Sequence, residues 1–298
     1  MRKALAIDVG GTKIYNTIID ENGKIIAEIE KRPTPKTFDE IREALLEIIK
    51  KYEDDVDVIA FASAGAANNE NTGLIGSTGN IAKGYSKMDF QNLSTKKVFV
   101  ENDANAAAWA EHVLGASKGC AHSVMITLGT GVGGGIIIDN KLLKGKSGAA
   151  GEMHFKLYRD KRRQCTCGAY DCFEAYASGT GLRKTAQEML NNPDVTTYDV
   201  IDGVKKNNPE MQKVFNRWQD DILIGIVGLA DIFDPCVVVL SGSMAEFVDT
   251  DYLEKEVNKQ IVTTPTTIRK ASAGNYSGMI GAALLALGKG LESTGDCA

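Results

Sequence analysis

The alternation of apolar and polar residues predicts a chain that begins with strands joined by tight turns. Two apolar runs, Lys3–Val9 and Ile14–Asp20, indicate strands on either side of Gly10-Gly11. Asn22-Gly23 is a strong hairpin signal, so a third strand is expected over Lys24–Glu30. The chain therefore opens with an antiparallel meander that contains a glycine turn.

The next segments read as a helix, two strands and a second helix. Apolar residues recur at helical spacing and predict an amphipathic helix: Phe38, Ile41, Leu45, Ile48 and Tyr52. The apolar, β-branched Val56–Ala62 suits a buried strand. Between this strand and Leu93 lies a Gly-, Asn- and Ser-rich stretch of the kind that often lines a site. Val98–Glu101 is a short strand that leads into an Ala-rich helix over Asp103–Leu114.

The opening pattern repeats at an offset of 120 residues. Ser123–Leu128 is a strand, Gly129–Gly135 a glycine-rich turn and Ile136–Asp139 another strand. Further expected elements are the strand Lys141–Leu143, the helix Met211–Phe233, the strand Cys236–Leu240 and the helix Met279–Leu291. This repetition predicts a duplicated α/β fold of two lobes with a central cleft. The expected lobes are residues 1–117, with the C-terminal helix (about 279–298) packed on them, and residues 118–278.

Composition narrows the classes of function. The 298 residues include 34 Lys+Arg and 39 Asp+Glu, so the net charge of −5 argues against a nucleic-acid partner. No apolar run approaches the roughly 20 residues of a membrane-spanning helix. Asp8 comes too early for a signal peptide. We therefore expect a cytoplasmic protein with neither nucleic-acid nor membrane partners.

The two glycine turns are candidate phosphate sites. Glycines let the backbone approach a phosphate and direct N–H groups at it. In the first turn Thr12 adds a hydroxyl, Lys13 a cation, and Asp8 a carboxylate placed to hold Mg²⁺ through water. A common hairpin turn is the alternative there. The second turn has five glycines among residues 129–135, a density that is costly unless close approach is required; sharp bends in a twisted sheet are the alternative.

Asp103 stands where a strand ends and the Ala-rich helix starts. Aspartate is a favoured N-cap residue, which is the purely structural interpretation. The functional interpretation is that Asp103 accepts a proton from a substrate hydroxyl that attacks phosphorus. The helix N-terminus would keep its carboxylate ionised, and phosphoryl transfer depends mainly on positioning and electrostatics.

A histidine and three cysteines indicate a structural zinc site. Cys165, Cys167 and Cys172 form a C-x-C-x₄-C pattern, and His154 lies 11 residues before the first cysteine. Three thiolates and one imidazole match a closed tetrahedral site, whereas free thiols clustered by chance are the alternative. Lys161-Arg162-Arg163 beside them is expected to be a solvated loop face.

Taken together, these residues resemble the ROK family (repressors, uncharacterised reading frames, sugar kinases) of the actin-like ATPase superfamily, over essentially the whole chain. Asp8–Lys13 and Leu128–Gly135 resemble its two phosphate motifs, and Val239–Ser243 its adenosine motif. Cys165–Glu174 resembles the family's zinc signature, and Ala175–Gly181 continues it. The resemblance implies an actin-like (ribonuclease H-like) ATPase fold and an ATP-dependent kinase that phosphorylates the 6-hydroxyl of a hexose.

The resemblance also implies roles for single residues. Asp103 would be the general base. The sugar would contact Asn80, Asn102, Asp103, Glu152, His154 and Glu174. ATP would contact Asp8, Gly10, Gly11, Thr12, Lys13, Thr130, Gly131, Gly133 and Gly242. Zinc, held by His154, Cys165, Cys167 and Cys172, would order the loop that carries Glu152 and Glu174, and Mg²⁺ would accompany ATP.

Two departures and several alternatives qualify this picture. The family usually reads Glu-x-Gly-His, but Gly151–His154 is one residue shorter, which affects a sugar contact by His154 more than a zinc contact. The loop Ser63–Asn71 also departs from the usual Gly-x-Pro-Gly pattern. Glucose is the expected substrate, with N-acetylmannosamine or N-acetylglucosamine as the alternative; the family suggests a homodimer. The sequence leaves open the hexose, the phosphoryl donor and the oligomeric state.

Other classes fit less well. A sugar-sensing ROK repressor needs a DNA-binding helix-turn-helix ahead of the first phosphate motif, and the first strand already begins at Lys3. An ATPase of the chaperone or filament kind would need a peptide-binding domain. The carboxylates beside the zinc motif favour a small polyol ligand instead.

Overall fold

The computed structural model describes residues 1–76 and 81–288, and the chain folds into two compact units. Unit 1 contains residues 1–121, 135–151 and the described residues from 272 onward, and unit 2 contains residues 122–134 and 152–271. Asn80 lies outside the described residues, as do residues 289–298 of the expected C-terminal segment 279–298.

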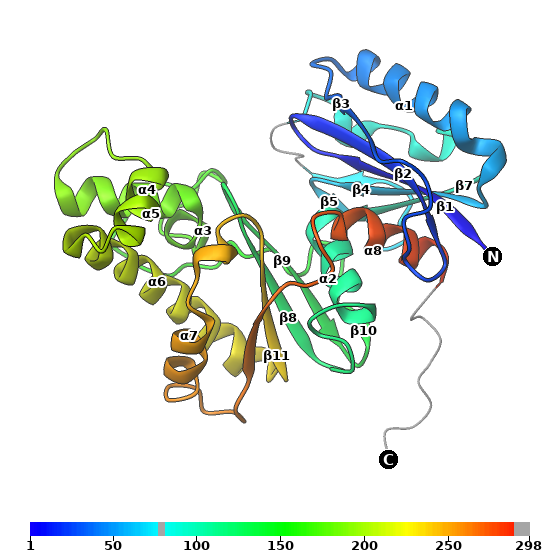
Figure 1. Ribbon diagram of the computed structural model, residues 1–298. Helices are drawn as coiled ribbons and strands as arrows, with labels where there is room; N and C mark the ends of the chain where they lie inside the picture. The colour runs from blue at the N-terminus through cyan, green and yellow to red at the C-terminus, as the bar shows by residue number, and fades with distance from the viewer. Residues whose placement is uncertain (77–80, 289–298) are drawn as a thin grey trace. The chain divides into compact units, whose positions relative to one another are not determined.

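Unit 1 is built on a five-stranded mixed sheet in the order β3-β2-β1-β4-β7 (Figure 1). Its strands are β1 (Lys3–Val9), β2 (Lys13–Asp20), β3 (Glu30–Pro33), β4 (Val58–Ser63) and β7 (Lys97–Asn102). Its α-helices are α1 (Phe38–Tyr52), α2 (Asp103–Val113) and α8 (Ser277–Ala286), and its shorter elements are β5 (Ala66–Ala67), β6 (Leu74–Ile75) and the 3₁₀ turns Glu53–Asp55, Tyr85–Lys87 and Phe90–Leu93. Helix α1 covers one face of this sheet, and α2 and α8 lie against the other (Figure 1).

Strand β1 shows why the sheet is covered on both faces. Its residues alternate: Leu5 and Ile7 pack in the core that includes α1, whereas Ala4 and Ala6 pack in the core that includes α2 and α8. The small side chains on the second face let two helices approach closely. An added side chain on Gly281 of α8 would clash with the backbone of α2.

Unit 2 contains most of the other five-stranded sheet and most of the helices. The sheet order is β10-β9-β8-β11-β12. Its strands are β8 (Ser123–Leu128), β9 (Val132–Ile138), β10 (Lys141–Leu142), β11 (Val237–Ser241) and β12 (Thr267–Lys270), of which β10 and the end of β9 belong to unit 1. The helices are α3 (Glu174–Ala177), α4 (Gly179–Leu190), α5 (Thr197–Lys205), α6 (Pro209–Phe233) and α7 (Thr250–Val257), with a 3₁₀ turn at Ala245–Phe247.

Three sequence expectations are corrected. The third strand runs over Glu30–Pro33, later than Lys24–Glu30, because an edge strand tolerates Pro33. Strand β9 begins at Val132, so the last glycines of the second motif lie in a strand. Residues 135–151, expected in the C-terminal lobe, belong to unit 1, because the chain crosses between the units within β9 and returns after Gly151. Among the described residues, no helix combines the length and apolarity needed to span a membrane.

Candidate active site

The predicted base lies at the junction of β7 and α2 in unit 1. The side-chain oxygen of Asn102 accepts the N–H groups of Ala104 and Asn105, both at 3.0 Å, and its Nδ2 donates to the Gly65 carbonyl at 3.0 Å. Asp103 is the first helical residue, and its Oδ1 accepts the Ala104 N–H at 2.9 Å. The N-cap is therefore Asn102, and the capping interpretation of Asp103 is wrong. Asp103 sits at the positive end of the helix dipole.

Asp8 is a second carboxylate on which the negative charge of Asp103 acts. Asp8 lies opposite Ala62 of the parallel neighbour β4, and Ser63 lies opposite Asn102, so both carboxylates stand at the same edge of the sheet. Burial, followed by the negative charge of Asp103, raises the pKa of Asp8 to about 7. A divalent cation would favour the ionised form of both groups, so this pair fits the expected Mg²⁺ role of Asp8.

The first glycine turn follows Asp8 directly. It closes through a hydrogen bond from the Gly10 N–H to the Lys13 carbonyl at 3.0 Å. Thr34 holds it from outside, with its N–H on the Thr12 carbonyl at 3.0 Å and its hydroxyl on the Gly10 carbonyl at 2.6 Å. Gly11, Thr12 and Lys13 are exposed. The turn therefore has a fixed backbone and an open face, as a phosphate site requires.

Glu101 is a functional candidate that sequence reasoning did not single out. It is 1% exposed and immediately precedes Asn102 and Asp103. Its carboxylate accepts Lys144 Nζ at 2.6 Å, Asn71 Nδ2 at 2.7 Å and the Asn102 N–H at 2.9 Å. This buried pair fixes the backbone on which the base stands. No sequence signal could have joined Glu101 to Lys144, which is 43 residues away.

The expected sugar loop, Ser63–Asn71, docks onto another segment of unit 1. Asn69 Nδ2 donates to the carbonyl oxygens of Gly145 and Lys146, at 3.1 and 2.9 Å. This segment runs directly into Glu152, one of the expected sugar ligands. The loop thus has its conformation set by long-range contacts that its local sequence does not reveal.

The second glycine turn, in unit 2, is held mainly by side chains. It closes through a hydrogen bond from the Gly129 N–H to the Gly131 carbonyl at 3.0 Å. The Val132 N–H donates to Glu174 Oε2, and the Gly133 N–H to the Thr127 hydroxyl, both at 3.0 Å. These two N–H groups are already engaged, so Gly133 supports the turn in this structure instead of offering its N–H to a ligand.

Two glycines of this motif serve packing in the sheet. An added Cβ on Gly134 would collide with the Met153 side chain, and one on Gly135 would lie 2.5 Å from the Ala108 Cβ. Close packing therefore requires glycine at Gly134 and Gly135, whatever the turn binds. The phosphate prediction is left to the turn that ends at Gly131.

Three segments of unit 2 meet at this turn. The Gly179 N–H, at the start of α4, donates to the Gly129 carbonyl at 2.8 Å, and the Thr180 hydroxyl donates to the Thr130 carbonyl at 2.9 Å. Gly242 has φ +87° and lies against the Leu128 carbonyl, where an L side chain would clash. The predicted ATP residues Thr130 and Gly242 thus lie on neighbouring segments of unit 2, together with α4, a helix that was not expected from the sequence.

The histidine and the cysteines converge as expected. One donor atom each of His154, Cys165 and Cys167 lie within 4.8 Å of one another, and Cys172 Sγ is 3.7 Å from Cys167 Sγ. A turn with Gly168 at φ +87° brings Cys165 and Cys167 together. Sulfur and imidazole donors at this spacing fit a tetrahedral zinc ion.

Two expected sugar ligands lie beside this cluster. Glu152 Oε2 is 3.3 Å from His154 Nδ1, and Glu174 Oε1 is 3.9 Å from His154 Nε2. Burial would raise the pKa of Glu174, but donors that include Thr166, Val132 and Cys165 lower it overall, so this carboxylate stays ionised.

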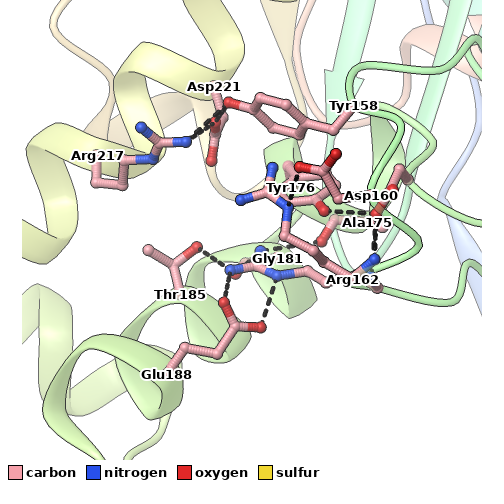
Figure 2. Close-up of polar contacts among 12 residues, drawn as sticks. Tyr158, Asp160, Arg162, Ala175, Tyr176, Gly181, Thr185, Glu188, Arg217 and Asp221 are labelled. Atoms are coloured by element: carbon pink, nitrogen blue, oxygen red, sulfur yellow. Dashed lines mark hydrogen bonds and ion pairs between the residues drawn. The ribbon is translucent and has the colours of Figure 1, made fainter.

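Arg163 braces the cysteine loop and is not a solvated residue as the sequence suggested. It is 6% exposed, and its guanidinium binds Glu188 at 2.6 and 2.8 Å and the Thr185 hydroxyl at 3.0 Å. Figure 2 shows Glu188 and Thr185 of this network and the neighbouring residues Arg162 and Tyr158. The guanidinium carbon of Arg162 lies 4.2 Å from the centroid of the Tyr158 ring. The loop is therefore tied to α4 independently of any metal.

The chain is similar to known proteins over nearly its whole length. The protein-family model described as "ROK family" matches residues 4–289, so the chain belongs to the ROK family. It is 32% identical to a glucokinase of Streptomyces coelicolor, over 96% of this chain and 98% of that protein. It is 33% identical to an N-acetylmannosamine kinase of Salmonella typhi, over 95% of this chain and 98% of that protein.

A solved structure is similar over nearly the whole chain. The ROK family glucokinase from Streptomyces griseus, crystallised with glucose and AMPPNP, has a TM-score of 0.79 and 29% identity, and the match covers 96% of this chain and 99% of that one. The family, the actin-like ATPase fold and the sugar kinase class expected from the sequence are confirmed.

Proposed function

We propose that this protein transfers the γ-phosphate of ATP to the 6-hydroxyl of a hexose, with glucose as the substrate. The observation that carries the proposal is the pair Asp8 and Asp103 beside the open first glycine turn. The glucokinase and N-acetylmannosamine kinase relatives support a hexose or N-acylhexosamine acceptor. N-acetylmannosamine and N-acetylglucosamine are the alternative substrates.

In the proposed reaction, Asp103 accepts the proton of the 6-hydroxyl while the hydroxyl oxygen forms a bond to the γ-phosphorus. The bond from that phosphorus to the β–γ bridging oxygen breaks, and ADP leaves. Residues Gly10–Lys13 and Thr130–Gly131 offer donors to the phosphates. Mg²⁺, held by Asp8 through water, would neutralise charge that develops on the phosphate oxygens.

The zinc site has a structural role in this proposal. The side chains of His154, Cys165, Cys167 and Cys172 would hold the ion and order the loop that bears Glu152 and Glu174. A cytoplasmic location would supply ATP and keep these thiols reduced.

A homodimer is the proposed assembly. One face of α6 is apolar and partly or fully exposed. It consists of Ile224, Val227, Gly228 and Ile232, and Ile232 is 73% exposed. Such an apolar helix face suits a contact with a second copy of the chain. Light scattering on the purified 32.0 kDa chain would then give about twice that mass.

A coupled ADP-release assay tests the function. Zinc-replete protein and MgATP are combined in turn with glucose, mannose, fructose, allose, N-acetylglucosamine and N-acetylmannosamine. The proposal predicts the highest kcat/KM with glucose, and a higher value with an N-acetyl sugar would select the alternative. Folded protein that releases no ADP above background with any of the six hexoses would contradict the kinase proposal itself.

A further inference from the structure

One carboxylate of unit 2 contacts both the second glycine turn and the cysteine loop. Glu174 begins α3, and its Oε2 accepts the Val132 N–H at 3.0 Å. The same oxygen lies 2.5 Å from the position that a Cβ on Gly131 would occupy. A side chain on Gly131 would therefore displace the Glu174 carboxylate.

The other oxygen of Glu174 faces the candidate zinc ligands. Glu174 Oε1 accepts the Thr166 hydroxyl at 2.6 Å and the Cys165 thiol at 3.4 Å, and His154 Nε2 is 3.9 Å away. Cys165 and His154 are two of the candidate zinc ligands, and Thr166 lies between two of the cysteines.

Glu174 has little freedom to absorb a displacement at either end. Its side chain is 13% exposed, and the preceding Phe173 is fully buried and stacks on Phe155 at 5.0 Å between ring centroids. The α6 residue Gly225 leaves room for the Phe173 ring, since a Cβ there would clash with it. A displacement of the Cys165–Cys167 turn would therefore displace the Glu174 carboxylate and, with it, its hydrogen bond to Val132.

We propose that Glu174 couples zinc binding to nucleotide binding. A zinc ion would fix the Cys165–Cys167 turn. Cys165 would release its thiol proton to solvent as its thiolate binds zinc, and the Thr166 hydroxyl would still hold Glu174 Oε1. Glu174 Oε2 would then keep the turn at Gly131 and Val132 in the conformation that receives phosphate. This inference rests on the proposed function, because it takes that turn to bind ATP.

Coupling of this kind is reciprocal. If AMPPNP strengthens zinc binding, zinc must strengthen AMPPNP binding by the same factor. The effect is independent of the hexose, so it separates this role of Glu174 from its expected sugar contact.

Competition with a chromophoric zinc chelator measures the coupling in the full-length protein, without hexose and in the presence of excess Mg²⁺. We expect saturating AMPPNP to lower the zinc Kd by about fivefold or more, within the usual range of coupling between sites. E174A keeps all four candidate ligands but should abolish the difference. D160A is the matched control and should retain the difference, because Asp160 is a carboxylate on the same loop that pairs with the Arg162 guanidinium at 3.7 Å.

The outcomes are separable. AMPPNP that binds by calorimetry yet leaves the zinc Kd unchanged would overturn the coupling and leave the proposed function intact. A full effect in folded E174A would overturn the role of Glu174. Absence of AMPPNP binding would overturn the proposed function and the coupling together. If E174A does not fold, Thr166→Val decides the matter, since loss of its hydroxyl should reduce the effect and an unreduced effect would refute the link.

Discussion

The two glycine turns occupy equivalent places in the sequence repeat but are stabilised differently. The turn at Gly10–Lys13 is closed by its own backbone and by one neighbouring residue, Thr34. The turn at Gly129–Val132 depends on the ionised side chain of Glu174, which belongs to a loop with metal-binding chemistry. Under the proposed function, the base belongs to unit 1, and nucleotide binding by the turn of unit 2 would depend on Glu174.

The largest effect should follow a change at the base in unit 1. Asp103→Asn should lower kcat by about 10²- to 10⁴-fold, because the amide cannot accept the hydroxyl proton. The KM for ATP should change little, since the glycine turns are untouched. Steady-state kinetics with glucose and a thermal melt measure both, and kcat within tenfold of wild type in a folded variant would refute the assigned role.

A change in the cysteine loop should act on nucleotide binding by the turn of unit 2. Cys167→Ser removes an exposed candidate ligand and should leave well under one zinc per chain, with a higher KM for ATP. Cys236→Ser is the control, because Cys236 is also exposed and lies outside the cluster. Metal analysis and kinetics decide; equal zinc contents in the two variants would argue against the assignment of Cys167.

The pH dependence of stability should distinguish unit 1. Folded Asp8 holds its proton up to about pH 7, whereas an unfolded aspartate ionises near pH 4. Between these values the folded state binds more protons, so the contribution of Asp8 to stability falls as the pH rises. Without Mg²⁺, the melting temperature of Asp8→Asn minus that of wild type should therefore increase from pH 4 to 7 and then level off.

Thermal melts across that range provide the measurement, with Asp54→Asn, at an exposed position of unit 1, as the control for general effects of pH. A difference between Asp8→Asn and wild type that stays constant with pH would contradict the raised pKa.

The smallest effects should come from single neutral hydrogen bonds. Thr34→Val removes the hydroxyl on Gly10 of the first turn, and Thr127→Val the acceptor for Gly133 of the second. Each bond is worth about 0.5–1.5 kcal/mol, which corresponds to roughly 2- to 10-fold in the KM for ATP. Glu174→Ala should exceed both, because its bond is charge-assisted. Kinetics at saturating glucose would contradict the comparison if Thr34→Val had the larger effect.

Local sequence patterns predicted the parts of the fold that local chemistry determines. Strand β1 and helix α1 fall at their expected bounds, since alternation and helical spacing are properties of neighbouring residues. Strand β3 did not, because after the turn at Asn22-Gly23 the chain makes only an isolated bridge from Ile25 to Ile19, and continuous pairing with β2 starts at Glu30.

The candidate site was predictable to a similar extent. The cysteines and His154 could be grouped by spacing alone, and their convergence follows. The choice between Asn102 and Asp103 as helix cap needed the actual backbone geometry. The long-range pairs Glu101 with Lys144 and Glu174 with Val132 could not be predicted, because tertiary folding brings those residues together.

Phosphoryl transfer to the 6-hydroxyl is tested most directly by comparing glucose with a sugar that lacks this hydroxyl. Wild-type protein with MgATP is given glucose or 6-deoxyglucose, and both ADP release and the ³¹P spectrum of the products are recorded. We predict ADP and a phosphomonoester on O6 with glucose, and neither product above background with 6-deoxyglucose. A sugar phosphate formed from 6-deoxyglucose, or ADP release with no sugar phosphate from glucose, would contradict it.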